Sequence, residues 1–147
     1  MSVVAVNFVD FDKAKFYFEK CAQYKYPEAY YYIGILYLKG YGVKTNIYKA
    51  KKYFELAALQ DHSIALNSLG MMYYLGTTSI KIDYKKAKEY FERALKLNYS
   101  GSLFYLGQLY YHGLGVETNC IKALNYFYES SKVSPESLYY IGHMYEN

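Results

Sequence analysis

Residues 32–55 read YIGILYLKGYGVKTNIYKAKKYFE, and this phrase returns along the chain at a nearly constant interval. Its first glycine recurs at spacings of 36, 37 and 35 residues, as Gly34, Gly70, Gly107 and Gly142. The alanine of its Lys-Ala step recurs at spacings of 36, 37 and 36 residues, as Ala14, Ala50, Ala87 and Ala123. Because two independent anchors give the same period, the sequence predicts a stack of equivalent units in place of one globular core.

The second half of each unit predicts a helix that packs along a narrow stripe. Two aromatic residues stand three and four positions after each alanine, as Tyr17-Phe18, Tyr53-Phe54, Tyr90-Phe91 and Tyr126-Phe127. The alanine, the second aromatic residue and a small residue near the eighth position share one helix face. Four positions before each alanine stands a residue of the type that caps helix N-termini: Asp10, Asn46, Asp83 and Asn119.

The first half of each unit predicts a helix that ends at a glycine. Residues 40–43 and 113–116 read Gly-x-Gly-Val. Glycine there ends the helix with a positive φ, and valine folds back as an apolar plug. Residues 76–80 of the middle unit lack the second glycine and include one extra residue, but Ile80 keeps the place of the valine. We therefore expect the loop to absorb the insertion and to retain the plug.

The predicted fold class is all-α: a right-handed α/α superhelix of antiparallel helix pairs, with about four repeats of period 36 in one domain over residues 1–147. The expected units are a lone second-type helix in 10–26, repeats over 27–61, 62–98 and 99–133, and a partial repeat over 134–147. The expected helical segments are about 11 to 24, pairs over about 27 to 60, 63 to 97 and 100 to 132, and about 135 to 145. Residues 3–8 are apolar, which would let them cover the N-terminal end of the stack, but no structure is assigned to them.

The repeated motifs resemble those of the Sel-one-like repeat (SLR) family, a relative of the tetratricopeptide repeat with a longer loop between its helices. The resemblance rests on Leu/Ile-Gly-x-x-Tyr, on the Gly-x-Gly-Val loop and on Asp/Asn-x-x-Lys-Ala with its trailing aromatic residues, and it covers nearly the whole chain from Asp10. It implies an adaptor or scaffold that binds other proteins. Since small stand-alone SLR proteins can serve as immunity proteins, it also implies a toxin neutraliser as one form of that role.

Two faces of each first helix have different predicted roles. Positions −4, −1, 0 and +3 from the glycine share one face, which we expect to pack on the second helix of the repeat. Positions −3, +1 and +4 lie roughly 120° around the helix, where we expect them to line the concave surface of the superhelix. These positions form three ladders: Tyr31, Asn67, Phe104 and Tyr139; Ile35, Met71, Gln108 and His143; Leu38, Tyr74, Tyr111 and Glu146.

The ladders predict a binding surface for a protein or peptide partner. They contain aromatic, apolar and amide side chains without lysine or arginine, and aromatic side chains concentrate affinity at protein interfaces. The 23 tyrosines support this interpretation, because a buried tyrosine needs a partner for its hydroxyl and so many cannot all be core. The alternative is that individual ladder residues only pack against the neighbouring repeat. A further contact is expected at the last helix, where Ile141 and Tyr145 would permit self-association.

The charge and the cysteine content limit the partners and the compartment that we expect for the chain. The net charge is +4 and is spread along the chain, which gives no strong preference for nucleic acid or membrane. Cys21 and Cys120 stand in no metal or redox spacing, and in a stacked fold they lie too far apart for a disulfide. We therefore expect free thiols and a cytoplasmic location. The N-terminus shows no basic leader, and no run of about 20 apolar residues is present.

The basic residues suggest RNA binding as an alternative function, and the titratable residues argue against an enzyme. Lysines cluster on the second helices, so RNA binding through this outer face, with Lys85 and Lys86, is the alternative function. Against it, several of these lysines stand four residues before a glutamate, which is typical of a solvated face. His62, His112 and His143 are isolated and no serine or cysteine has an identifiable base. We accordingly predict no enzyme, no cofactor and no metal.

Overall fold

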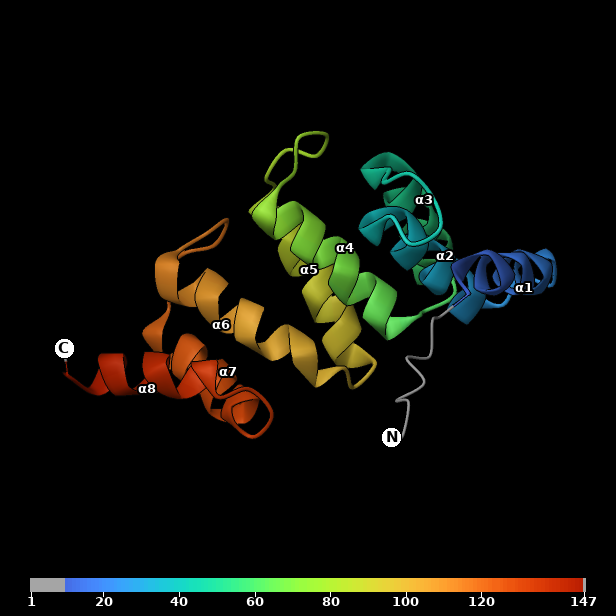
Figure 1. The fold of residues 1–147 in the computed structure, drawn as a ribbon. Helices are drawn as coiled ribbons and strands as arrows, with labels where there is room; N and C mark the ends of the chain where they lie inside the picture. Colours follow the sequence, from blue (N-terminus) through green and yellow to red (C-terminus); the bar gives the residue numbers. More distant parts are fainter. Residues whose placement is uncertain (1–9, 147) are drawn as a thin grey trace, which may run out of the picture.

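The computed structural model describes residues 10–146 and shows an all-helical chain (Figure 1). Its α-helices are α1 (Phe11–Gln23), α2 (Pro27–Lys39), α3 (Ile47–Ala58), α4 (Ser63–Leu75), α5 (Tyr84–Lys96), α6 (Leu103–His112), α7 (Cys120–Ser131) and α8 (Glu136–Glu146), with a 3-10 turn at Ser100–Ser102. The described residues contain no strand. The predicted all-α solenoid of helix pairs is therefore confirmed.

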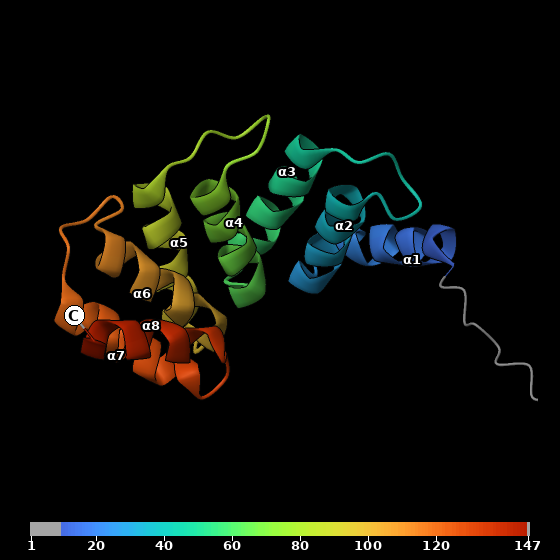
Figure 2. The ribbon, with the colours of Figure 1, turned by 60° about the vertical axis from the view of Figure 1, so that its left-hand side comes forward.

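The helices form a curved stack in chain order. The most extensive contacts join α2 to α3, α4 to α5 and α6 to α7, and smaller contacts join each pair to the next. Figure 2 shows the stack bending into an arch, and Figures 1 and 2 both place α1 and α8 at its opposite ends. Each helix pair thus contacts only its neighbours along the chain, which is the arrangement of a solenoid.

Local capping explains where the second-type helices begin. The side chains of Asp10, Asn46, Asp83 and Asn119 each accept a hydrogen bond from the backbone N–H three residues on, at 2.9–3.0 Å. These bonds satisfy donors that the first helical turn leaves without an intrahelical partner. The four predicted caps are confirmed. The helix α4 adds one that sequence patterns did not suggest, because His62 Nδ1 accepts from the N–H of Ala65 at 3.1 Å.

Close contact between a glycine and a phenylalanine holds each helix pair together. A Cβ atom built on the glycine would lie 2.6 Å from the ring, in the pairs Gly34 with Phe54, Gly70 with Phe91 and Gly107 with Phe127. All three phenylalanines are fully buried. The ring therefore rests on the backbone of the first helix, as the stripe of small and aromatic residues predicted, and a larger residue than glycine would push the helices apart.

A second contact repeats on the outer side of each pair. Two tyrosines stack with ring centroids 5.8–5.9 Å apart, as Tyr37 on Tyr53, Tyr73 on Tyr90 and Tyr110 on Tyr126. A lysine from the first turn of the second helix lies 4.9–5.2 Å from the first ring of each stack: Lys49, Lys86 and Lys122. These tyrosines are a structural element of the repeat, which accounts for part of the tyrosine surplus.

The loops between paired helices follow the predicted glycine rule. Gly40, Gly76 and Gly113 cap their helices with φ between +67° and +74°. In the longer middle loop Ile80 is buried, so the plug is retained there as expected. One boundary differs from the prediction, because α6 begins at Leu103 after a 3-10 turn instead of near residue 100. Gly101 is a poor helix former, and its backbone lies against the ring of Tyr99.

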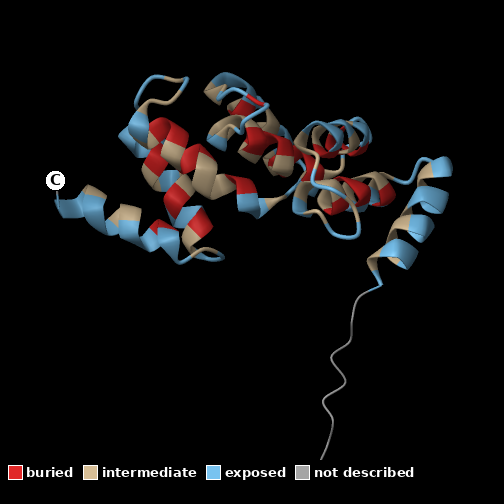
Figure 3. Ribbon diagram, turned by 45° about the horizontal axis from the view of Figure 1, so that its top comes forward, coloured by how far each residue is buried: buried red, intermediate tan, exposed pale blue. Residues whose placement is uncertain are grey.

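Burial is concentrated in the middle of the stack. Figure 3 shows buried segments along α2 to α7, whereas the end helices are mostly exposed. No residue of α1 is buried, and in α8 only Ser137 is. The reason is geometric, since an internal helix packs against neighbours on two sides and an end helix on one.

Candidate protein-binding surface

The ladder residues lie on the first-type helices α2, α4, α6 and α8. Among those that contact a residue of the next repeat are Tyr31, Asn67, Tyr74 and Tyr111. Asn67 is buried, Tyr139, His143 and Glu146 are exposed, and the others are half-buried. The exposed ladder residues therefore all lie on α8. The contacts of each ladder residue decide how much of it remains available to a partner.

A chain of hydrogen bonds crosses three repeats near the middle of the ladders. The Tyr74 hydroxyl donates to Gln108 Oε1 at 2.5 Å, and Gln108 Nε2 donates to the Tyr140 hydroxyl at 2.9 Å. Burial raises the pKa of Tyr74 to about 12, with smaller contributions from nearby tyrosines led by Tyr84. The hydroxyl therefore stays protonated and acts as a donor at neutral pH. Tyr140 was not among the predicted site residues, because it stands two positions before its glycine.

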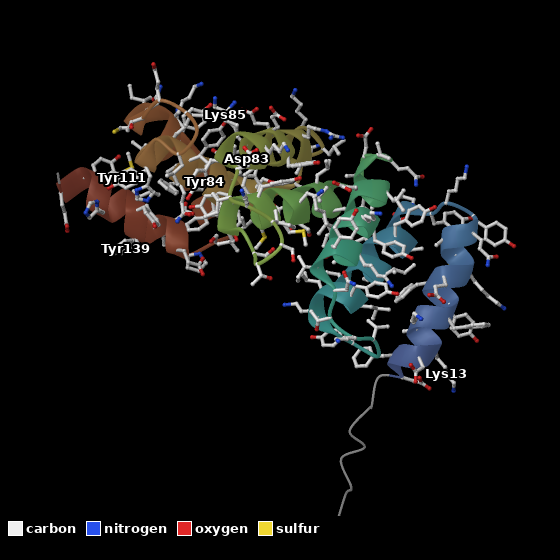
Figure 4. All side chains as sticks on the ribbon, turned by 90° about the horizontal axis from the view of Figure 1, so that it is seen from above. Lys13, Asp83, Tyr84, Lys85, Tyr111 and Tyr139 are labelled. Carbon is white, nitrogen blue, oxygen red and sulfur yellow. The ribbon has the colours of Figure 1, made fainter. Side chains whose placement is uncertain are left out.

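The same contact recurs one repeat further on. The Tyr111 hydroxyl and His143 Nδ1 are hydrogen-bonded at 2.7 Å, again joining the +4 position of one repeat to the +1 position of the next. The Tyr139 ring lies nearly parallel to that of His143, with centroids 6.3 Å apart, and is 70% exposed. Figure 4 shows Tyr111 and Tyr139 at the C-terminal end of the stack, far from Lys13 at its start. Tyr139 is the most exposed aromatic residue of the ladders.

The N-terminal ladder residues are more deeply engaged. The Tyr31 ring stacks on the His62 ring with centroids 4.9 Å apart, and burial raises the pKa of Tyr31. Burial also lowers the pKa of His62, so its Nδ1 is an unprotonated acceptor for the helix cap. Asn67 accepts a hydrogen bond from the hydroxyl of Ser102 at 2.9 Å inside the stack. Because Asn67 is buried there, it differs from the predicted groove position and lies outside the accessible surface.

The apolar ladder residues pack partly into the core. Ile35 and Leu38 contact the core cluster of the first two full pairs, and Met71 contacts the cluster around Phe91. Phe104 packs against Phe127 with centroids 6.1 Å apart. Phe104 also contacts Tyr140 of the next repeat, with ring centroids 5.9 Å apart. All four side chains are half-buried.

The outer lysines are largely engaged with neighbouring side chains. The i,i+4 pairs Lys15–Glu19, Lys51–Glu55 and Lys88–Glu92 have N···O distances of 3.4, 2.7 and 3.0 Å. Lys86 lies near Asp83 and over the ring of Tyr73. A phosphate backbone would have to compete with these contacts.

The described part of the chain shows no sign of a metal site or a membrane span. Residues 10–146 hold no cluster of three or more histidine, cysteine, aspartate or glutamate side chains that could bind a metal. No helix in the same range is both long and apolar enough to cross a bilayer. Cys21 and Cys120 are exposed free thiols.

Comparison with curated proteins finds one short but close relative. Over 46 residues the chain is 48% identical to the ERAD-associated E3 ubiquitin-protein ligase component HRD3B of Arabidopsis thaliana. The matched segment is 31% of this chain and 8% of that protein. The likeness therefore concerns a part of the relative that is about one repeat long.

Comparison with solved structures extends the likeness to almost the whole fold. A Sel1 repeat protein from Oxalobacter formigenes aligns at TM-score 0.84 and 27% identity over 92% of this chain and 56% of its own. The protective antigen c5321 of uropathogenic Escherichia coli aligns with a TM-score of 0.85 and 29% sequence identity. This alignment covers 92% of the present chain and 29% of the c5321 chain. Helicobacter pylori cysteine rich protein B aligns with a TM-score of 0.62 and 25% identity. This alignment covers 84% of the present chain and 94% of the Helicobacter protein.

The family comparison agrees with the repeat boundaries seen in the structure. The model of the Sel1 repeat matches residues 8–23, 27–62, 63–99 and 100–132, which include α1 to α7. The chain spans about half of the Oxalobacter protein and less than a third of c5321. With matches over most of its length and the same stacked helix pairs, the chain belongs to the Sel1 repeat family.

Proposed function

We propose that this chain is a non-enzymatic protein-interaction module, and that a protein or peptide partner binds along its ladder residues. The observation that carries the proposal is the exposed aromatic group at the C-terminal end of the ladders. There Tyr139, His143 and Tyr111 form one continuous surface, fixed by the hydrogen bond between Tyr111 and His143. Rigid aromatic side chains of this kind anchor interfaces at low entropic cost.

The chemistry of the surface defines the class of partner. The ladders contain aromatic rings, a histidine and two amides, and their only charged member is Glu146. A partner segment with apolar or aromatic side chains and exposed backbone hydrogen-bonding groups would fit this surface, whereas a strongly acidic one would gain nothing from it. The half-buried residues Tyr31, Ile35, Leu38, Met71, Tyr74, Phe104 and Gln108 would form the floor of the site.

The relatives favour protein binding over other functions. A component of a ubiquitin-protein ligase acts within a protein assembly, and its matched segment resembles a repeat of this chain. An adaptor and a toxin-neutralising immunity protein are both forms of this function. We also infer a reducing compartment such as the cytoplasm, which the exposed free thiols of Cys21 and Cys120 support.

Site-specific photocrosslinking tests the location of the surface. A photoreactive phenylalanine analogue at Tyr139 should capture a partner from the source cell, and the same analogue at Tyr48 should not. Tyr48 is the matched control because it is 60% exposed but lies on the second-type helix α3. The captured protein is then purified and its affinity measured.

The affinity measurement decides the proposal. With the purified partner, Tyr139→Ala should weaken binding by about tenfold or more, as expected for an aromatic hot spot, while Tyr48→Ala leaves it unchanged. The measurement is made at chain concentrations where the protein is monomeric. Equal affinity of Tyr139→Ala and the unmodified chain would contradict the proposed surface.

A further inference from the structure

The three internal helix pairs define a template for how a first-type helix receives a second-type helix. The first helix supplies positions −4, −1, 0 and +3, and the glycine at position 0 contacts a phenylalanine ring in every pair. The +3 tyrosine stacks on the tyrosine that precedes this phenylalanine. The glycine–phenylalanine contact and the tyrosine stack occur together in all three pairs. An exposed helix face with the glycine and the first tyrosine is therefore expected to fit an exposed face with the second tyrosine and the phenylalanine.

The last helix, α8, presents the first half of this template with no second-type helix on it in residues 10–146. The corresponding positions are Leu138, Ile141, Gly142 and Tyr145. Leu138 is 59% exposed and Tyr145 78% exposed. A Cβ atom at Gly142 would meet nothing within 4 Å, whereas at the three internal glycines it would strike a phenylalanine. The face has the shape of the internal ones but is uncovered.

The first helix of the structure, α1, presents the second-type half of the same template. Ala14, Tyr17 and Phe18 occupy the positions of the internal alanine, tyrosine and phenylalanine. Phe18 already stacks on Tyr32 of the following helix at 5.1 Å, as Phe127 stacks on Tyr140 at 4.8 Å. Its other side has no glycine to rest on among the described residues, and Tyr17 is 61% exposed. Within residues 10–146, α1 is thus a second-type helix with one of its two faces uncovered.

The outer edge of the last full repeat is more apolar than the same edge of the internal repeats. The lysine and glutamate of the pairs Lys51–Glu55 and Lys88–Glu92 lie beside the tyrosine stack of the next repeat. In α7 the same two positions are Leu124 and Tyr128. Leu124 and Tyr145 line an apolar pocket of about 200 Å³ together with Cys120, Ile121 and Met144. A charged pair is therefore replaced by apolar residues at the uncovered end.

We propose that the chain associates head to tail, with α1 of a second copy packing on α8 in the place that a second-type helix takes in the internal pairs. In this contact Phe18 of one copy rests on Gly142 of the other, and Tyr17 stacks on Tyr145. A chain cannot make the contact with itself, because α1 and α8 lie at opposite ends of the arch (Figure 1). The interface is heterologous, so the copies add in one direction along a continued solenoid.

Two substitutions block the two halves of the contact separately. Gly142→Arg fills the space for the phenylalanine ring, and it leaves the fold intact because nothing described surrounds that position. Tyr17→Glu places a charge on the exposed face of α1. Matched controls are Gln60→Arg in an exposed turn and Tyr48→Glu, since Tyr48 is 60% exposed and lies on α3.

Sedimentation velocity from micromolar to millimolar concentration measures the effect. The unmodified chain and both controls should form species that grow with concentration. Gly142→Arg and Tyr17→Glu should each remain monomeric. An equimolar mixture of these two variants should form a one-to-one dimer and nothing larger, because one variant keeps α1 and the other keeps α8. Circular dichroism melting of each variant verifies that the fold is retained.

Three results would overturn the proposal. The first is a monomeric unmodified chain at the highest concentration. The second is a dimer that persists in Tyr17→Glu, which would indicate a symmetric contact between two α8 helices. The third is a mixture of the two variants that stays monomeric. None of these bears on Tyr139, which lies on a different face of α8, so partner binding and self-association fail independently.

Discussion

At the scale of single residues, Ser130 is an exception to the rule that buried polar atoms are paired. It occupies the position of Ala57 and Ala94 in the other second-type helices, is 1% exposed, and its hydroxyl has no hydrogen-bond partner within the described structure. A buried hydroxyl without a partner costs about 1–3 kcal/mol. The serine therefore weakens the contact between α7 and its neighbours.

Ser130→Ala is expected to stabilise the protein by about 1 kcal/mol, because it removes the unpaired hydroxyl and restores the best helix former. Urea unfolding followed by circular dichroism measures the change. Ser131→Ala is the control, since the Ser131 hydroxyl already donates to the carbonyl of Tyr128 at 2.7 Å. A loss of stability in Ser130→Ala would show that the hydroxyl has a partner after all.

His62 links stability to acid pH. Its folded pKa lies below the ordinary value because of burial. As pH falls, the unfolded chain therefore binds the proton first, and the unfolded state is favoured. The contribution of His62 is complete above about pH 6.5 and is lost as pH falls through the lowered folded pKa. Protonation also removes the Nδ1 acceptor that caps α4.

His62→Asn should remove this acid dependence while keeping a cap, because asparagine caps α3 and α7 in the same way. Urea unfolding between about pH 5 and pH 7.5 should give a shallower loss of stability than in the unmodified chain. His112→Asn, which removes an exposed histidine, serves for comparison. An unchanged slope in His62→Asn would mean that the cap does not titrate.

At the scale of helices, the end elements differ from the middle ones in how much they bury. The α4 helix buries six residues, while α1 buries none. The internal contacts repeat, so the difference comes from the number of neighbours and not from the type of helix. Local opening free energy follows the contacts that an element would lose.

Backbone amide exchange should therefore be faster in α1 and α8 than in α4 and α5, by about tenfold or more in protection factor. The reason is that opening an end helix exposes one interface and opening a middle helix exposes two. Exchange followed by mass spectrometry on peptides measures the order, at a concentration where the protein is monomeric. Uniform protection along the stack would show a single cooperative unit in place of fraying ends.

At the scale of the whole molecule, tyrosine hydroxyls link successive repeats. The bonds from Tyr74 to Gln108 and from Gln108 to Tyr140 join α4, α6 and α8. Burial raises the pKa of Tyr74 and also of Tyr31, Tyr53, Tyr90, Tyr105 and Tyr126. A raised folded pKa means that the folded state resists losing its proton. This part of the stability is complete below about pH 10 and is lost as pH rises through the folded values.

Tyr74→Phe should make the alkaline loss of stability shallower, because the pKa of Tyr74 is about 12 in the folded chain and about 10 in the unfolded one. It should also lower stability at neutral pH by about 1 kcal/mol, since Gln108 loses its donor. Urea unfolding between about pH 8 and pH 11 measures both effects. The exposed Tyr139→Phe is the control, and an equally steep slope in Tyr74→Phe would refute the assignment.

Sequence patterns alone are enough to predict the period, the two helix types, the caps and the loop glycines. Each depends on residues close together in the chain: Asn46 caps a helix three residues on, and Gly40 ends one by its own φ. The contact of Gly34 with Phe54 could also be predicted, because pairing within a repeat follows from the stripe on each helix.

The exposure of each ladder residue, in contrast, depends on how the repeats pack against one another. Asn67 is buried against Ser102 and Tyr74 is tied to Gln108, residues about one repeat apart, while Tyr139 on the same predicted face is 70% exposed. Helical periodicity assigns a residue to a face, but the distance to the next repeat depends on the curvature and twist of the whole stack. That distance is a sum over many contacts, so no local pattern records it.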